Sequence, residues 1–226
     1  MARHAKLQCA FRGRGPQLTA VKRMDTDLVV LVSDRNTEAA MEGILSRLQS
    51  LRIRTITYRI LVHPEKDPGC RLHGHELLRI HQDTHRYALM VFDREGSGAD
   101  EKSRAELEFE CEERLSSTGW KERAAVIVLD PEVEIWLWSD SPVVDTALDW
   151  DNRTPKLRDW LIAKGHVFDG PKPKRPKEAT EAALHAVRKP RSSSLYRDLA
   201  EKVSLDRCVD PAFVRLRELL RSWFKK

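Results

Sequence analysis

The sequence predicts an α/β protein with a mainly parallel sheet flanked by helices, followed by a helical C-terminal extension. Short apolar runs without alternation, such as the β-branched run in 27–33 and the run 87–92, are typical of strands buried on both faces. Segments with helical apolar spacing separate these runs, and the pattern changes after residue 150. Strands that alternate with helices form crossover units, which predict parallel pairing and helices on both faces of the sheet.

The first strand is predicted at 27–33, and Thr37 is the expected N-cap of a helix whose apolar residues recur from Ala40 to Leu51. The remaining elements of this domain follow in the same alternating order. They are a strand at 53–62, a helix at 72–83, a strand at 87–92, a charged helix at 101–115 and a strand at 123–129. We expect the strands near 28–33, 87–92 and 124–129 to be parallel neighbours or near neighbours.

Three regions are expected along the chain. Residues 1–25 form a basic, turn-rich arm, residues 26–150 the α/β domain, and residues 151–226 the helical extension. The extension contains a proline-rich basic linker at 171–177, which cannot be helical throughout. Its helices are predicted at 157–164, 178–188, 192–203 and 211–225.

Composition narrows the class of protein. The 226 residues are 41% hydrophobic and 33% charged, as in ordinary globular proteins, and the net charge of +5 is compatible with a polyanionic partner without naming one. No apolar run approaches the roughly 20 residues that cross a bilayer, and the start lacks a secretory signal, so a cytoplasmic location without membrane contact is expected. The four cysteines contain no Cys-x-x-Cys pair and fit a reducing compartment.

Carboxylates follow three of the four predicted strands. Asp34 follows the first, Asp93 and Glu95 the third, and Glu132 and Glu134 the fourth. In open α/β sheets, ligands bind beyond the carboxyl ends of the strands, where these side chains should converge. Clustered carboxylates repel one another unless a cation compensates, and hard oxygen ligands favour Mg²⁺ or Mn²⁺. The alternative is that each acid caps a helix or favours a turn.

These segments also resemble a known fold. Val32-Ser-Asp-Arg-Asn-Thr-Glu38, Phe92-Asp-Arg-Glu-Gly-Ser-Gly98 and Pro131-Glu-Val-Glu-Ile-Trp136 resemble the TOPRIM fold, the metal-binding domain of topoisomerases, bacterial primases and OLD-type nucleases. The closer likeness is to small TOPRIM-like proteins of prokaryotic defence islands, RloB-like ones among them. It covers about residues 27 to 140.

The resemblance implies a role for each matching acid. Asp34 stands where the family has a glutamate that serves as general acid or base, and Asp93 with Glu95 stands where an Asp-x-Asp pair holds Mg²⁺. Glu134 matches a late acidic residue near the site, and Glu38 a turn glutamate expected to cap the helix. Asp34 and Glu95 differ in length from the family's residues, and a misplacement of about 1 Å can cost roughly a hundredfold in rate.

Other residues are weaker candidates. His63 and Asp67 lie in the loop after the second strand and could border the acidic site, as could Glu132. Cys70, His73 and His75 fit no established zinc spacing. The basic residues of the linker and the segment Arg188-Lys-Pro-Arg191 are candidates for phosphate contacts, and the tryptophans are expected in the core, with base stacking as the alternative. The linker residues are Lys172, Lys174, Arg175 and Lys177, and the tryptophans are Trp136, Trp138, Trp150 and Trp160.

The sequence supports two function hypotheses. The first is a Mg²⁺-dependent TOPRIM-like nuclease or phosphodiesterase of an anti-phage defence system, with nucleic acid and other defence proteins as partners. The second is a non-catalytic subunit that uses the same core to bind a nucleotide, a nucleic acid or a partner protein. No Gly-x-x-x-x-Gly-Lys-Ser/Thr loop is present, so an ATPase of that class is not expected.

Overall fold

Four parallel strands form the central sheet of the protein in a computed structural model, which describes residues 26–139 and 141–226. The strands are β1 (Thr26–Val32), β2 (Tyr58–Val62), β3 (His85–Asp93) and β4 (Ala124–Leu129), in the order β2-β1-β3-β4. All three neighbouring pairs are parallel, so the predicted fold class and the adjacency of the first, third and fourth strands are confirmed. The predicted arm at 1–25 lies outside the described residues.

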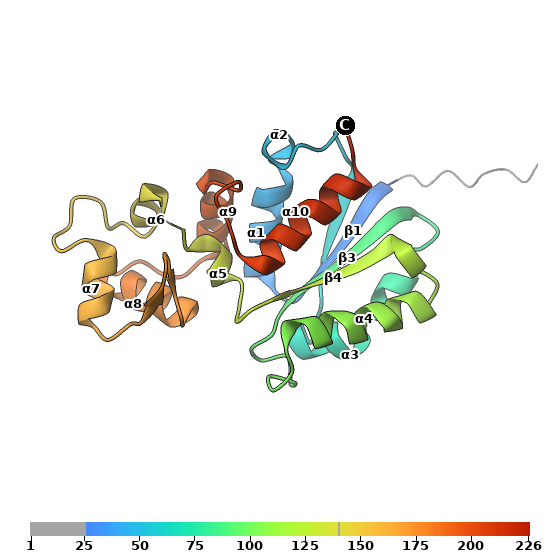
Figure 1. The fold of residues 1–226 in the computed structure, drawn as a ribbon, viewed down its shortest axis with the longest axis horizontal. Coiled ribbons are helices and arrows are strands. Elements are labelled where there is room, and N and C mark those ends of the chain that lie inside the picture. Colours follow the sequence, from blue (N-terminus) through green and yellow to red (C-terminus); the bar gives the residue numbers. More distant parts are fainter. Residues whose placement is uncertain (1–25, 140) are drawn as a thin grey trace, which may run out of the picture.

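The strands carry apolar residues on both faces, as their sequence predicts. In β1, Leu28, Val30 and Val32 face one hydrophobic core, while Val29 and Leu31 face the other. Helices α1 (Arg35–Leu45) and α10 (Pro211–Trp223) cover the first face, and α3 (Lys66–Arg79) and α4 (Arg104–Ser117) cover the second (Figure 1). The sheet is therefore the middle of three layers.

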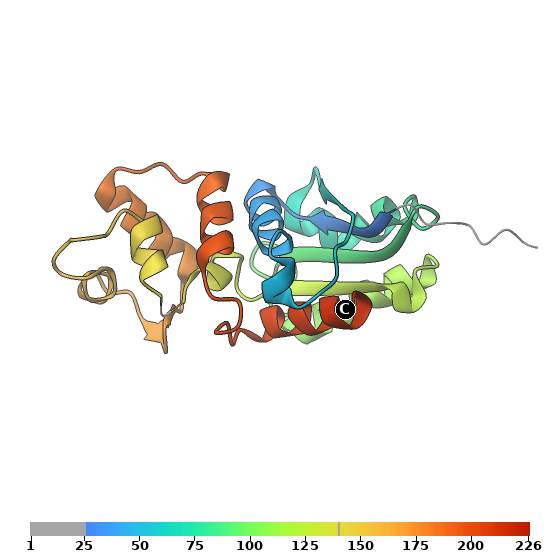
Figure 2. The ribbon, with the colours of Figure 1, turned by 90° about the horizontal axis from the view of Figure 1, so that it is seen from above.

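A group of short elements lies beyond the carboxyl ends of the strands (Figures 1 and 2). It consists of α5 (Glu134–Leu137), α6 (Pro142–Ala147), α7 (Leu157–Ala163), the hairpin β5 (Phe168–Asp169) and β6 (Lys172–Pro173), and α8 (Pro176–Val187). Helix α9 (Ser193–Lys202) then brings the chain back to the sheet domain and α10 returns along the sheet. The short elements α2 (Leu48–Leu51) and the 3₁₀ turn Lys121–Arg123 complete the fold.

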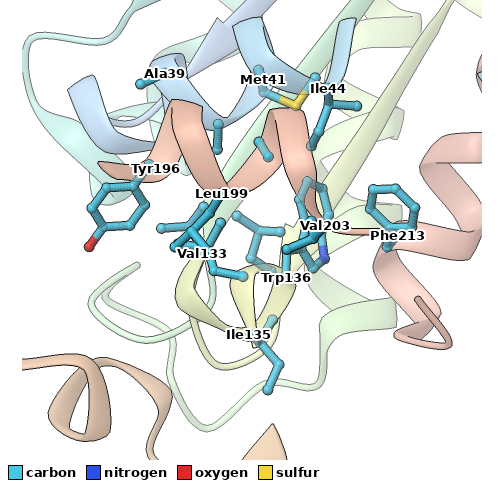
Figure 3. Packing of buried hydrophobic residues seen from close by; sticks show 14 of the residues in the cluster. Ala39, Met41, Ile44, Val133, Ile135, Trp136, Tyr196, Leu199, Val203 and Phe213 are labelled. Carbon is cyan, nitrogen blue, oxygen red and sulfur yellow. The ribbon is translucent and has the colours of Figure 1, made fainter. Parts of the chain in front are cut away.

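Helix α9 packs closely between α1 and α5. Figure 3 shows Tyr196 and Leu199 of α9, and Val203 directly after it, among buried residues of α1 and the α5 segment. The approach to α1 depends on Gly43, since a Cβ there would lie 2.8 Å from the Ala200 Cβ. The extension thus shares one hydrophobic core with the sheet.

The tryptophans of this region serve packing, as expected. Trp136, Trp138 and Trp150 are buried, and Trp160 packs against the same core. The indole of Trp136 donates a hydrogen bond of 2.9 Å to Asp210, which also caps α10. These rings join elements that are distant in the sequence and do not form an exposed stacking surface.

Several element boundaries differ from the prediction, and the first helix, expected to continue to Leu51, ends at Leu45 with α2 as a separate element. The strand expected at 53–62 begins only at Tyr58, because the Arg54 N–H pairs with the carbonyl of Phe224, at the end of α10, and the Asp27 carboxylate binds Arg54 and Thr57. The helix expected at 72–83 is α3, which begins at Lys66, since proline is tolerated within a first helical turn. Among the described residues, no helix is both long and apolar enough to cross a membrane.

Candidate functional site

A cleft of about 770 Å³ opens at the carboxyl ends of the strands, facing the start of α8. Acidic residues from the strand ends and basic residues from the segment around α8 line it together. The charged lining residues are Asp34, Lys66, Asp67, Asp93, Arg94, Glu95, Asp100, Glu132, Lys174, Arg175, Lys177, Glu178, Glu181 and Arg191.

Every strand of the sheet ends near a carboxylate. Asp67 follows β2, Asp34 follows β1, Asp93 ends β3 and Glu132 follows β4. The parallel order brings these ends to one edge, as the sequence predicted, and all of them line the cleft. Asp67, a residue considered from the sequence as a border of the site, lies in the first turn of α3 and lines the cleft, so it extends the set from three strand ends to four.

Asp93 is at the centre of the acidic group. Burial raises its pKa well above the usual value, and repulsion by Asp67, Glu134, Asp34 and Glu132 adds to the effect. Its Oδ1 is buried and has no hydrogen-bond partner among the described residues. A buried carboxylate oxygen without a partner needs a proton or a cation to compensate its charge.

Asp67 is tied to Asp93 through the backbone. Its Oδ1 accepts a hydrogen bond of 2.8 Å from the Asp93 N–H. Burial raises the pKa of Asp67, which that hydrogen bond partly opposes. The bond fixes the first turn of α3 against the end of β3.

Asp34 has a structural role as well as a place in the cleft. Its Oδ1 accepts hydrogen bonds from the Thr37 N–H at 2.8 Å and the Thr37 hydroxyl at 2.9 Å, so Asp34, and not Thr37, is the N-cap of α1. The capping alternative for this acid is therefore correct, although Asp34 also lines the cleft. Glu38 pairs with Arg35 at 2.6 Å and does not line the cleft, so the capping role expected for Glu38 belongs to Asp34 instead.

The two acids after β4 already have basic partners. Glu132 accepts a 3.0 Å hydrogen bond from the Lys177 N–H, and the Lys177 ammonium lies 3.5 Å away. Burial, followed by repulsion from Glu134, raises the pKa of Glu132 to about 7. Glu134 is 1% exposed and binds Arg191 and the Tyr196 hydroxyl through Oε1. It lies behind the cleft wall rather than in the lining.

Glu95 differs from its predicted partner Asp93 in environment. It lies exposed on the loop after β3, where its backbone N–H binds the carbonyl of Pro131. Its charge raises the pKa of Glu132. Gly96 follows with a φ of +83° and open space around it, so the backbone at this rim is accessible to a ligand.

The basic linker divides into two parts. Lys174, Arg175 and Lys177 line the cleft, whereas the Lys172 ammonium donates a hydrogen bond of 2.6 Å to the Ile135 carbonyl and does not. Sequence reasoning did not assign Lys66 and Arg94 to the site, although each is adjacent in sequence to an aspartate of the cleft. Arg191 belongs to the basic segment expected to contact phosphate, and it lines the cleft.

The histidine candidates lie apart from the cleft. His63 is buried against Gly69 of α3, and its Nδ1 accepts a 3.1 Å hydrogen bond from the Glu65 N–H. Cys70 is a buried thiol whose pKa burial raises. In the described parts of the chain, no three His, Cys, Asp or Glu side chains are arranged closely enough to hold a metal ion, so Cys70, His73 and His75 form no zinc site.

The lack of a three-residue metal-binding group among the described residues also applies to the carboxylates of the cleft. Within the described chain they do not form a cage made only of protein ligands. Mg²⁺ seldom needs one, because it retains several waters and is usually held by one or two carboxylates together with substrate phosphates. The partnerless Oδ1 of Asp93 and the all-oxygen donors beside it fit such an ion.

No family model, curated protein or solved structure matches the chain, so the case for its function rests on the residues and geometry of the cleft.

Proposed function

We propose that the chain is a Mg²⁺- or Mn²⁺-dependent phosphodiesterase with a TOPRIM-like core that acts on nucleic acid. The observation that carries this proposal is the Asp93 carboxylate, whose buried Oδ1 has no partner among the described residues and which four other carboxylates repel. Burial, followed by this repulsion, raises the pKa of Asp93, and a cation at this position would oppose both effects.

Each wall of the cleft has a distinct role in this proposal. Asp93 and Glu95 would hold the ion, with Asp67 beside them, whereas Glu134 binds Arg191 through Oε1 and lies outside the cleft lining. A bound Mg²⁺ supplies charge stabilisation to a phosphoryl group and lowers the pKa of a water. Asp34 would accept the proton through the oxygen that does not cap α1.

The basic residues complete the site. Lys174, Arg175 and Lys177 enter the cleft from the α8 side, opposite the strand ends. Lys66 and Arg94 stand next to the two central aspartates in the sequence. A phosphodiester can bind between the two walls, because its backbone contacts require positive charge and no base-specific geometry.

A non-catalytic binding subunit is the second candidate. It is supported by the native cations that occupy two of the acids, Lys177 at Glu132 and Arg191 at Glu134. The capping role of Asp34 points the same way. Membership of an anti-phage defence system, with other defence proteins as partners, rests on the resemblance and is proposed for either candidate.

The first test is metal-dependent stability. At a Mg²⁺ concentration of 100 times the Kd, the native state gains about 2.7 kcal/mol, which raises the Tm by roughly 5–10 °C in a chain of this size. The gain should be much smaller for Asp93→Asn and unchanged for Asp198→Asn, which alters an exposed aspartate of α9. Equal shifts in wild type and Asp93→Asn would remove Asp93 from the proposal.

The second test is cleavage of labelled single- and double-stranded DNA and RNA with Mg²⁺ and with Mn²⁺. The changes Asp34→Asn, Asp93→Asn and Glu95→Gln should each abolish most cleavage, and double changes should add little, since residues that act as a unit are not additive. Cleavage at the full rate by Asp93→Asn would refute the nuclease and favour the binding subunit.

A further inference from the structure

A second hollow, of about 480 Å³, adjoins the acidic cleft. Lys164, Gly165, His166, Val167, Lys174, Arg175 and Glu178 line it, and we call it the outer groove. Lys174, Arg175 and Glu178 also line the acidic cleft. The two hollows therefore adjoin each other at the start of α8.

The wall unique to the outer groove is built by the end of α7. The chain turns at Gly165, which has a φ of +92°, and the His166 N–H binds the Leu161 carbonyl. The Val167 carbonyl then accepts a hydrogen bond of 2.9 Å from the Lys174 N–H. This bond ties the turn to the segment that leads into the acidic cleft, so the two basic walls are held together.

The outer groove is positively charged. Its only carboxylate among the described residues, Glu178, is paired with Arg175 at 2.6 Å. The exposed side chains of Lys164 and Lys174 have no carboxylate partner within the described chain, and the Lys164 ammonium lies 5.8 Å from the Trp160 ring centroid. An anion in this groove would meet two cations whose charge is not already neutralised.

We propose that the outer groove binds a further phosphate of the strand whose scissile phosphate lies in the acidic cleft. The substrate is then an oligonucleotide that runs past the start of α8, and not a mononucleotide or dinucleotide. This inference rests on the proposed function, because it extends the same site. The exposed Val167 offers an apolar surface for the sugar or base that accompanies the phosphate.

The test is binding of fluorescent oligothymidylates of 2, 4, 8 and 12 nucleotides, measured by anisotropy in EDTA and in Mg²⁺ with a cleavage check. Affinity should rise steeply between 2 and 8 nucleotides. Lys164→Glu should weaken binding of the longer strands at least fivefold at 0.1 M salt, since each phosphate contact on a single strand contributes a salt exponent of about 0.7. It should leave binding of the dinucleotide unchanged, because Lys164 does not line the acidic cleft.

Two further variants distinguish the effect of the Lys164 charge on binding from the effect of a folding defect. Lys164→Gln should show a smaller loss of the same length dependence, and Lys202→Glu, which reverses an exposed charge on α9, should behave as wild type. Affinity that does not increase with strand length would refute phosphate binding in the outer groove. A Lys164→Glu variant with wild-type affinity for 12 nucleotides would refute it as well. The remaining outcome is binding that depends on strand length and on Lys164 while the metal neither stabilises the protein nor supports cleavage. That result would refute the phosphodiesterase but support phosphate binding in the outer groove.

Discussion

Glu132 makes the native state sensitive to pH in a direction that can be measured. A carboxyl whose pKa rises from 4.5 to about 7 costs about 3 kcal/mol of native-state stability once it is ionised, since one pKa unit corresponds to about 1.4 kcal/mol. Between these two values the native state binds more protons than the unfolded state, so the contribution of Glu132 to stability falls as the pH rises from about 4.5 to 7.

The change Glu132→Gln removes this titration. Glutamine retains an oxygen that can accept the Lys177 N–H, so the hydrogen bond to the start of α8 can persist. Wild type and variant should have similar free energies of unfolding near pH 4.5. At pH 8 the variant should be more stable by up to about 3 kcal/mol, or roughly 6–12 °C in Tm.

Urea unfolding at pH 4.5, 5.5, 6.5, 7.5 and 8.5 gives this difference directly, in buffers without divalent metal. The matched control is Glu113→Gln, which changes an exposed glutamate of α4 and should follow wild type at every pH. A difference between wild type and Glu132→Gln that stays constant with pH, or a variant that is less stable at pH 8.5, would refute the burial and repulsion assigned to Glu132.

Three other predictions concern contacts around the site. Arg191→Met should destabilise the protein by about 3 kcal/mol in urea, because it leaves the buried Glu134 unpaired, and adding Glu134→Gln should recover most of the loss. Gly43→Ala should lower stability by about 1–3 kcal/mol, since its Cβ would collide with α9, and a wild-type Tm would argue against that packing. Lys172→Met should reduce stability without altering the salt dependence of oligonucleotide binding, because Lys172 binds the Ile135 carbonyl. Lys174→Glu should instead weaken binding and flatten its salt dependence. Equal effects of the two changes on the salt dependence would show that both lysines contact the nucleic acid.

The sheet was predictable because its information is local. The run 87–92 and the interior of 27–33, from Leu28 to Val32, are apolar without alternation, and a strand covered on both faces accommodates such a run in a mixed α/β pattern. The convergence of Asp34, Asp93 and Glu132 followed from the same argument, since parallel strands end at one edge.

Only the tertiary structure decided how each acid is used. Glu134 is neutralised by Arg191, 57 residues away, and Lys172 is held by a carbonyl 37 residues away. Residues 53–57 do not join the second strand, because the Arg54 N–H binds the carbonyl at the end of α10. Local apolar patterns determine which segments become strands and helices, but a charged side chain takes its partner from whatever the packed elements bring within hydrogen-bond reach. That choice appears only when α8, α9 and α10 have returned to the sheet.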